Sequence, residues 1–201
     1  MPDAYLTISE ETEYLLKEKG SKFFAYCFKV NNEQEVQARL HALKKTHHSA
    51  RHHCYAYRFG KSGEQFRSND DGEPNHSAGD PILRQLTGRE LTDTLVVVVR
   101  YFGGTKLGVG GLIQAYGGAA EGALELAGIK EVDCMVRAEV SFSYAQMSEV
   151  MRVLKSHELD MESHRFEVTC ALSVLIPQRI SQKVLEELVE IPFIQVKHQA
   201  L

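Results

Sequence analysis

The last third of the chain alternates between two hydrophobic periods, and their order restricts the possible fold more than any other feature of the sequence. Apolar side chains at every second position predict half-buried strands, and apolar side chains three or four positions apart predict amphipathic helices. The predicted strands are 136–144, 159–164, 166–176 (which includes Val168) and 191–197, and the predicted helices are 145–157 and 177–188. This β-α-β-β-α-β order predicts a ferredoxin-like domain in residues 131–201.

The preceding 130 residues mix strands and helices in a less regular order. Asn32 precedes the first helical stripe and can accept a hydrogen bond from the free N–H groups of a helix, so we expect a helix to begin after it. Residues 95–101 are apolar on both faces, which is typical of a central strand. The predicted strands are 23–30, 54–59, 65–69 and 95–101, and the predicted helices are 33–46, 80–88 and 111–127. We therefore expect an α+β protein with domains at 1–130 and 131–201.

Charge and composition exclude several classes of protein. The net charge of −4 argues against binding of nucleic acid by bulk electrostatics. Residues 1–130 carry 16 basic and 16 acidic side chains and residues 131–201 carry 7 and 11, so an anionic partner is expected to meet the N-terminal part. The four cysteines form no C-x-x-C pair, which is typical of buried thiols in a reducing compartment. No apolar run approaches the roughly 18 residues of a membrane span, and no secretory signal is visible, so we expect a cytoplasmic protein.

A glycine-rich segment follows the predicted central strand and opens the third helix. Five glycines accompany Lys106 within nine residues, namely Gly103, Gly104, Gly108, Gly110 and Gly111. Their spacing matches neither a Walker A loop nor a dinucleotide-binding fingerprint. Glycines allow positive φ angles and close backbone approach, and a helix N-terminus presents unpaired N–H groups to an anion. The segment predicts either an anion site, above all for phosphate, or a tight turn that serves only packing.

An acidic turn precedes this segment in the chain. Asp70, Asp71 and Glu73 lie within four residues, and Asp80 follows. Carboxylates of this kind, together with water and phosphate, can hold Mg²⁺. Aspartates in turns also hydrogen-bond their own backbone, which is the structural alternative. No cofactor is expected other than this possible magnesium ion.

Residues 44–53 form a basic segment that is rich in histidine. Arg51 and His53 are candidates for anion binding, and His52 or His53 could serve as an acid or base near neutral pH. Neighbouring side chains of a strand point to opposite faces, so His52 and His53 cannot both face the site that would contain Lys106. The alternative is a basic surface patch with one partly buried histidine.

Several motifs in these segments resemble the IMPACT/YigZ family. They are Asp70-Asp71-Gly72-Glu73-Pro74, then Ser77-Ala78-Gly79 with Pro81, then Arg100-Tyr101-Phe102-Gly103-Gly104, which continues through Gly108, Gly110 and Gly111 to Tyr116. Residues 21–25 and 50–57 match the same family, and the resemblance covers residues 15–127. One departure is that His76 and Ser77 stand where the family pattern has glycine and threonine.

The resemblance implies an N-terminal domain like the second domain of ribosomal protein S5. It also implies a C-terminal ferredoxin-like domain similar to domains of translation elongation factor G. Eukaryotic members look like translational regulators that bind a ribosome-associated activator of an initiation-factor kinase. For bacterial members the family implies no settled biochemical activity.

These observations favour a non-enzymatic binding protein that acts near translation. Arg51, Arg100, Lys106 and the glycine segment would contact RNA, the ribosome, or a translation or stress factor. One alternative is a phosphoryl-transfer or phosphoester-hydrolysing enzyme, in which Asp70, Asp71 and Glu73 hold a metal ion and His53 moves a proton. Another is a module that docks proteins through the C-terminal sheet and has no anion site.

Overall fold

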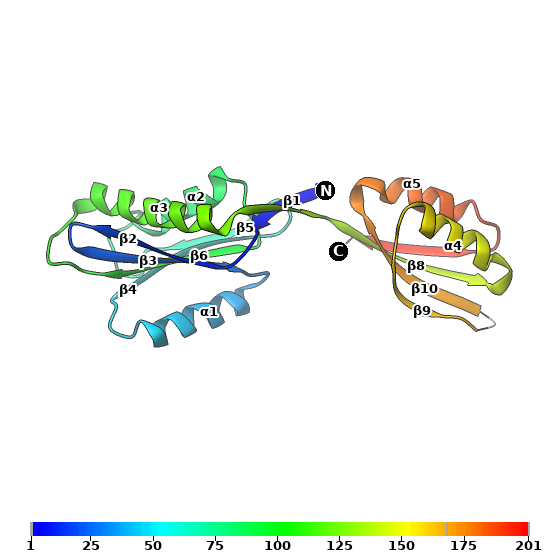
Figure 1. The fold of residues 1–201 in the computed structure, drawn as a ribbon, viewed down its shortest axis with the longest axis horizontal. Coiled ribbons are helices and arrows are strands. Elements are labelled where there is room, and N and C mark those ends of the chain that lie inside the picture. The colour runs from blue at the N-terminus through cyan, green and yellow to red at the C-terminus, as the bar shows by residue number, and fades with distance from the viewer. Residues whose placement is uncertain (1, 168, 201) are drawn as a thin grey trace. The chain divides into compact units, whose positions relative to one another are not determined.

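The computed structural model describes residues 2–167 and 169–200, so Val168 of the third predicted C-terminal strand lies outside the described residues. The chain divides into two compact units (Figure 1). One, here called the N-terminal unit, is Tyr5–Val132; the other, the C-terminal unit, is Asp133–Leu201 together with Met1–Ala4. Both contain antiparallel sheets and helices, which confirms the predicted α+β class with two domains.

A five-stranded antiparallel sheet forms the centre of the N-terminal unit. Its order is β2-β3-β6-β4-β5, so β6 lies in the middle as its apolar sequence predicts. The strands are β2 (Thr12–Glu18), β3 (Ser21–Lys29), β4 (His52–Phe59), β5 (Gln65–Asn69) and β6 (Thr94–Tyr101). Two further strands, β1 (Ala4–Ile8) and β7 (Ile129–Asp133), pair with each other.

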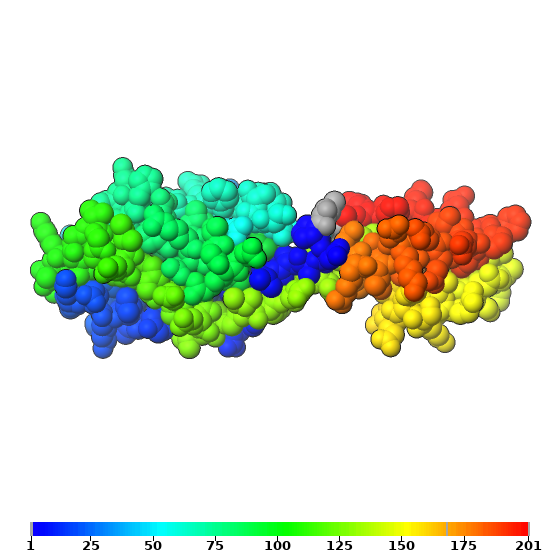
Figure 2. All heavy atoms as spheres, turned by 90° about the horizontal axis from the view of Figure 1, so that it is seen from above, coloured from blue at the N-terminus to red at the C-terminus, as the bar shows by residue number. Residues whose placement is uncertain are grey.

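Helices cover both faces of this sheet. The helix α1 (Glu33–Thr46) lies on one face and begins at Asn32, whose side chain accepts a hydrogen bond from the Glu35 N–H as predicted. The helices α2 (Gly79–Gly88) and α3 (Gly108–Ala127) lie on the other face, which Figure 2 shows from outside in green.

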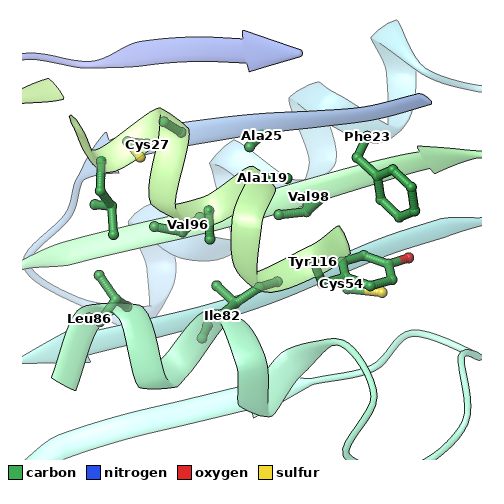
Figure 3. Close-up of a cluster of buried hydrophobic side chains, with 14 of the residues drawn as sticks. Phe23, Ala25, Cys27, Cys54, Ile82, Leu86, Val96, Val98, Tyr116 and Ala119 are labelled. Carbon is green, nitrogen blue, oxygen red and sulfur yellow. The ribbon is translucent and has the colours of Figure 1, made fainter. Parts of the chain in front are cut away.

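Two apolar cores result, one on each face of the sheet. Alternate residues of β6 enter them, so Val96 and Val98 pack beneath α2 and α3 while Val97 and Val99 pack beneath α1 (Figure 3 shows the first core). The small residues of α3 let this helix lie close to the sheet, because the buried alanines along it need little space.

The C-terminal unit has the predicted β-α-β-β-α-β order and the strand order β11-β8-β10-β9. Its helices lie on one face of the sheet (Figure 1), where the apolar residues of both layers form one core. The elements are β8 (Met135–Ser143), a short 3₁₀ turn η1 (Tyr144–Gln146), α4 (Met147–Ser156), β9 (Met161–Arg165), β10 (Thr169–Pro177), α5 (Gln178–Val189) and β11 (Gln195–Ala200).

Several boundaries differ from the predictions. The strand β4 begins at His52, two residues before the predicted start, and α3 begins at Gly108, three residues before its predicted start. The predicted last strand, 191–197, is displaced to β11. No strands were predicted before residue 21, where β1 and β2 lie. Within residues 2–167 and 169–200, no helix is both long and apolar enough to span a membrane.

Candidate nucleic-acid interface

The strands β3, β4 and β6 each have one terminus at the same end of the N-terminal sheet. In the antiparallel register Lys22, near the start of β3, pairs with Tyr101 at the end of β6, and His52 at the start of β4 pairs with Arg100. The connections β2–β3, α1–β4 and β6–α3 therefore leave the sheet at the same end (Figure 1). This geometry brings together the basic segment and the glycine segment, which lie about fifty residues apart in the chain.

Two pockets at this end share Tyr101 and Phe102 as lining residues. The cationic pocket has a volume of about 400 Å³ and is lined by Ser49, Arg51, His52, Arg100, Tyr101 and Phe102. The aromatic pocket has a volume of about 340 Å³ and is lined by Gly20, Lys22, Phe24, His47, Tyr101 and Phe102. Arg51 and Lys22 are exposed, and neither forms an ion pair within the described part of the chain.

Phe102 stands between the two pockets with 59% of its surface exposed. The Arg100 guanidinium carbon lies 5.6 Å from the centre of the Phe102 ring and 5.5 Å from the centre of the buried Phe23 ring. Cation–π contacts at these distances are favourable. They connect the exposed ring to the core, so Arg100 supports Phe102 from below the surface.

Arg100 itself is buried and does not face solvent as a free cation. Its Nη1 donates to Glu73 Oε1 at 2.7 Å, and the Tyr116 hydroxyl donates to the same oxygen at 2.8 Å. Burial raises the pKa of Tyr116, so its hydroxyl keeps the proton that it donates. Figure 3 shows Tyr116 beside Phe23 and Cys54 in the core. Among the described residues, Arg100 Nε has no hydrogen-bond partner.

The acidic turn uses its carboxylates within the fold. Asp70 Oδ1 accepts hydrogen bonds from the N–H groups of Ala78 and Gly79 at the start of α2, and its Oδ2 accepts one from His76. Asp71 Oδ2 accepts from the His53 N–H at 2.7 Å. No group of three or more possible ligands within residues 2–167 and 169–200 is arranged to hold a metal ion. The hydrogen bonds of Asp70 and Asp71 to backbone N–H groups are those of the structural alternative for this turn.

The glycines of the β6–α3 connection have different roles. A Cβ at Gly103 would overlap the backbone of Gly20 and Ser21, so this position requires close approach of two connections. Gly104 and Gly108 have φ angles of 91° and 71°, which favour glycine. A Cβ at Gly110 would meet open space. Packing and backbone conformation thus account for Gly103, Gly104 and Gly108 without a ligand.

None of residues 103–111, which include the five glycines predicted to bind an anion, lines either of the two pockets. A Cβ at Gly111 would come within 3.0 Å of the Leu107 side chain, which the neighbouring helix turn can accommodate only with a small shift. Lys106 is exposed in the same connection but lines neither pocket.

The histidines of the basic segment separate as their strand positions predict. His52 lines the cationic pocket, and its Nδ1–H donates to the Asp71 carbonyl oxygen at 2.9 Å. His53 points to the α1 side and is buried, which lowers its pKa. His47 lies in the aromatic pocket between the hydroxyls of Tyr26 and Tyr101, at 2.7 and 2.9 Å, and burial lowers its pKa as well. His53 therefore lines neither pocket, whereas His52 lines the cationic pocket.

His76 adopts a φ angle of 63°, a left-handed conformation that favours glycine. This backbone conformation explains why the family pattern has glycine at this position. The His76 imidazole Nδ1 lies 2.6 Å from Asp80 Oδ2, so the replacement adds a hydrogen bond to the first turn of α2. Its neighbour Ser77 keeps a hydroxyl, which donates to the Pro74 carbonyl oxygen at 2.6 Å.

Comparison with known proteins decides the family. Residues 19–124 match the model of the Impact N-terminal domain, and this segment contains both pockets and the acidic turn. The chain belongs to the IMPACT family. The IMPACT family member YvyE of Bacillus subtilis (strain 168) is 32% identical over 191 residues, which cover 95% of this chain and 88% of that protein. The IMPACT family member YigZ of Escherichia coli (strain K12) is 30% identical over 179 residues, covering 88% and 85%.

Two further similarities extend the family comparison. The Protein IMPACT homolog of Dictyostelium discoideum is 42% identical over 97 residues, which cover 45% of this chain and 27% of that protein. A crystal structure described as that of a hypothetical protein matches with a TM-score of 0.72 and 25% identity, and it covers 98% of this chain and 97% of its own. A solved structure of similar length thus shares the fold described above.

Part of this site was missed at the level of sequence. Lys22, Phe24, His47 and Ser49 line the two pockets but were not proposed as ligand-binding residues. Lys22 lies beside Tyr101 because of the register of β3 against β6. Periodicity alone does not reveal this register.

Proposed function

We propose that this IMPACT-family protein is a non-enzymatic binding protein that acts in translation and contacts RNA through the three strand ends of the N-terminal unit. The observation that carries the proposal is the position of exposed Phe102 in the shared wall of two pockets that are lined by the exposed cations Arg51 and Lys22. Aromatic and cationic side chains side by side are typical of surfaces that bind nucleic acid. The neutral charge balance of residues 1–130 means that the attraction is local.

The proposed role in translation is based on the family. The resemblance links eukaryotic members to translational regulation, and a Protein IMPACT homolog is among the relatives of this chain. Ribosomal RNA is accordingly the expected partner, in the cytoplasm. A shared fold does not transfer a function, so the proposal depends on the cations and the aromatic ring at this site.

A binding function suits the geometry better than phosphoryl transfer. Asp70 and Asp71 accept hydrogen bonds from backbone N–H groups, and Glu73 faces Arg100. A metal ion would compete with these partners for the carboxylates. His53, the candidate acid or base, is buried on the α1 side.

Co-sedimentation with ribosomes and filter binding of RNA test the proposal at low and moderate salt. Arg51→Ala and Lys22→Ala should weaken retention, because each removes a cation that would meet a phosphate, which also reduces the slope of log K against log salt by about 0.7–0.9. Arg67→Ala is the matched control, since Arg67 is exposed on the far edge strand β5. Equal retention of all variants, or no retention of the wild type, would contradict the proposal.

A further inference from the structure

The two pockets differ in chemistry although they share a wall. The cationic pocket is lined by Arg51 and Arg100, together with the polar residues Ser49 and His52. The aromatic pocket has ring walls from Phe24, His47, Tyr101 and Phe102, with Lys22 as its cation. A ligand that fills both must join an anionic group to a flat apolar group across the width of one phenyl ring.

A nucleotide is a ligand of this kind. Its phosphate carries the charge that Arg51 can meet, and its base has two faces that stack on aromatic side chains. Pockets for small ligands have volumes of about 300–1,000 Å³, and these measure about 400 and 340 Å³. Each pocket is thus large enough for one part of a nucleotide.

The aromatic walls have contacts within the fold that position them for stacking. Arg100 lies over the Phe102 ring at 5.6 Å and is itself held by Glu73. In the aromatic pocket, Tyr101 is held by His47 through a hydrogen bond of 2.9 Å and contacts the Phe24 ring at a centroid distance of 5.8 Å. Contacts that position a binding surface in advance reduce the entropy that binding would otherwise cost.

We propose that the paired pockets form a subsite for one unpaired nucleotide of single-stranded RNA, and this inference rests on the proposed function above. The base enters the aromatic pocket and stacks on the face of Phe102 opposite Arg100, and the phosphate enters the cationic pocket beside Arg51. A base within a duplex is stacked on both faces by its neighbours, so duplex RNA cannot occupy the subsite without losing a base pair.

Tryptophan fluorescence provides a direct test, because the chain has no tryptophan. Phe102→Trp introduces one fluorophore at the shared wall and keeps an aromatic face. Phe66→Trp is the matched control, since Phe66 is 62% exposed on β5 and lines neither pocket. We expect an octamer of uridine to quench the emission of the Phe102→Trp variant and to leave that of the Phe66→Trp variant unchanged.

A second measurement uses the uridine octamer with an attached fluorophore, and its affinity for the protein is measured by fluorescence anisotropy. Phe102→Ala should weaken binding about tenfold, within the range expected for one stacked base, and Phe66→Ala should leave it unchanged. A duplex of the same length should bind more weakly than the octamer. Equal affinity of wild type and Phe102→Ala, or tighter binding of the duplex, would overturn the subsite while leaving RNA binding itself in place.

Two further arms separate the subsite from the proposed function. If uridine monophosphate binds as tightly as the octamer, the nucleotide subsite is supported, but its ligand is a free nucleotide. The proposed RNA-binding function is then contradicted. If inorganic phosphate displaces the octamer while Phe102→Ala has no effect, the aromatic pocket takes no base and the inference falls. If no RNA and no nucleotide binds, both proposals fall.

Discussion

The buried ion pair between Glu73 and Arg100 allows the most demanding test of how this site is built. The two residues are 9% and 7% exposed, and Glu73 Oε1 accepts from both Arg100 and Tyr116. Glu73→Gln keeps the size of the side chain and one acceptor oxygen, but it removes the charge that Arg100 faces. Breaking a buried pair costs about 3–5 kcal/mol, and we expect the lower end because the amide oxygen retains hydrogen bonds.

A loss of this size is measurable in urea. Domains of this kind are typically stable by about 5–15 kcal/mol, so a loss of about 3 kcal/mol removes a large share of the free energy of unfolding. With a denaturant dependence of about 1–3 kcal/mol per molar urea, the unfolding midpoint should fall by about 1–3 M. Circular dichroism at constant pH would follow the transition.

Two variants make the test specific to burial. Glu11→Gln removes the same charge from the exposed pair between Arg39 and Glu11, where the atoms lie 2.6 Å apart, and it should change the free energy of unfolding by less than about 1 kcal/mol. Adding Arg100→Leu to Glu73→Gln removes the uncompensated charge and should restore most of the lost stability. If Glu73→Gln is as stable as Glu11→Gln, the buried pair does not hold this site together.

Three further outcomes test other parts of the N-terminal unit. Gly103→Ala should destabilise the fold by more than about 2 kcal/mol, as overpacking does. Gly110→Ala should instead stabilise the fold by up to about 1 kcal/mol, because alanine favours a helix. Thermal unfolding would compare the two variants, and equal melting temperatures would contradict the packing role of Gly103. Asp70→Ala should lower the free energy of unfolding by about 1–2 kcal/mol, because α2 loses its cap. Addition of Mg²⁺ should leave the melting temperature of the wild type unchanged, and a rise with magnesium would instead favour a metal site. Burial lowers the pKa of His53, so the unfolded state binds more protons below about pH 6.5. The free energy of unfolding should then fall as the pH falls from about 6.5 towards that lowered pKa, with a smaller slope in His53→Leu; an unchanged slope would refute this.

Local patterns predicted the elements whose apolar faces are complete. The stripe of α1 and its Asn32 cap, the doubly buried β6 and the alternation of β8 each contain their own signal within a few residues. The C-terminal unit follows from such signals alone, because its sheet and helices each have one apolar face.

The strand β2 escaped prediction for a physical reason. It lies at the edge of the sheet, and its inner residues Tyr14 and Leu16 are only half buried while Leu15 is exposed. The contrast between its faces is therefore weak. Edge strands are shaped by contacts with distant elements, here with α3, and a single sequence does not display those contacts.

The candidate site was only partly predictable for a similar reason. The motif at residues 100–111 marks the region, but the close contact of Gly103 with Gly20 joins positions more than eighty residues apart. The roles of Arg100 and Arg51 differ because only Arg100 faces Glu73 in the core. Sequence alone treated both as free cations, and burial separates them.

The buried cysteines provide internal reporters of local opening. Cys27 and Cys54 lie in the core beneath α2 and α3, and Cys170 lies in the core of the C-terminal unit. Burial raises the pKa of Cys27 to about 12, and the Cys54 thiol donates to the Asp70 carbonyl oxygen. Alkylation of each thiol requires that its own surroundings open first. Pulsed labelling read by mass spectrometry would thus time the opening of the two units separately in the unmodified protein, with Cys54 reporting on the loop that holds the acidic turn.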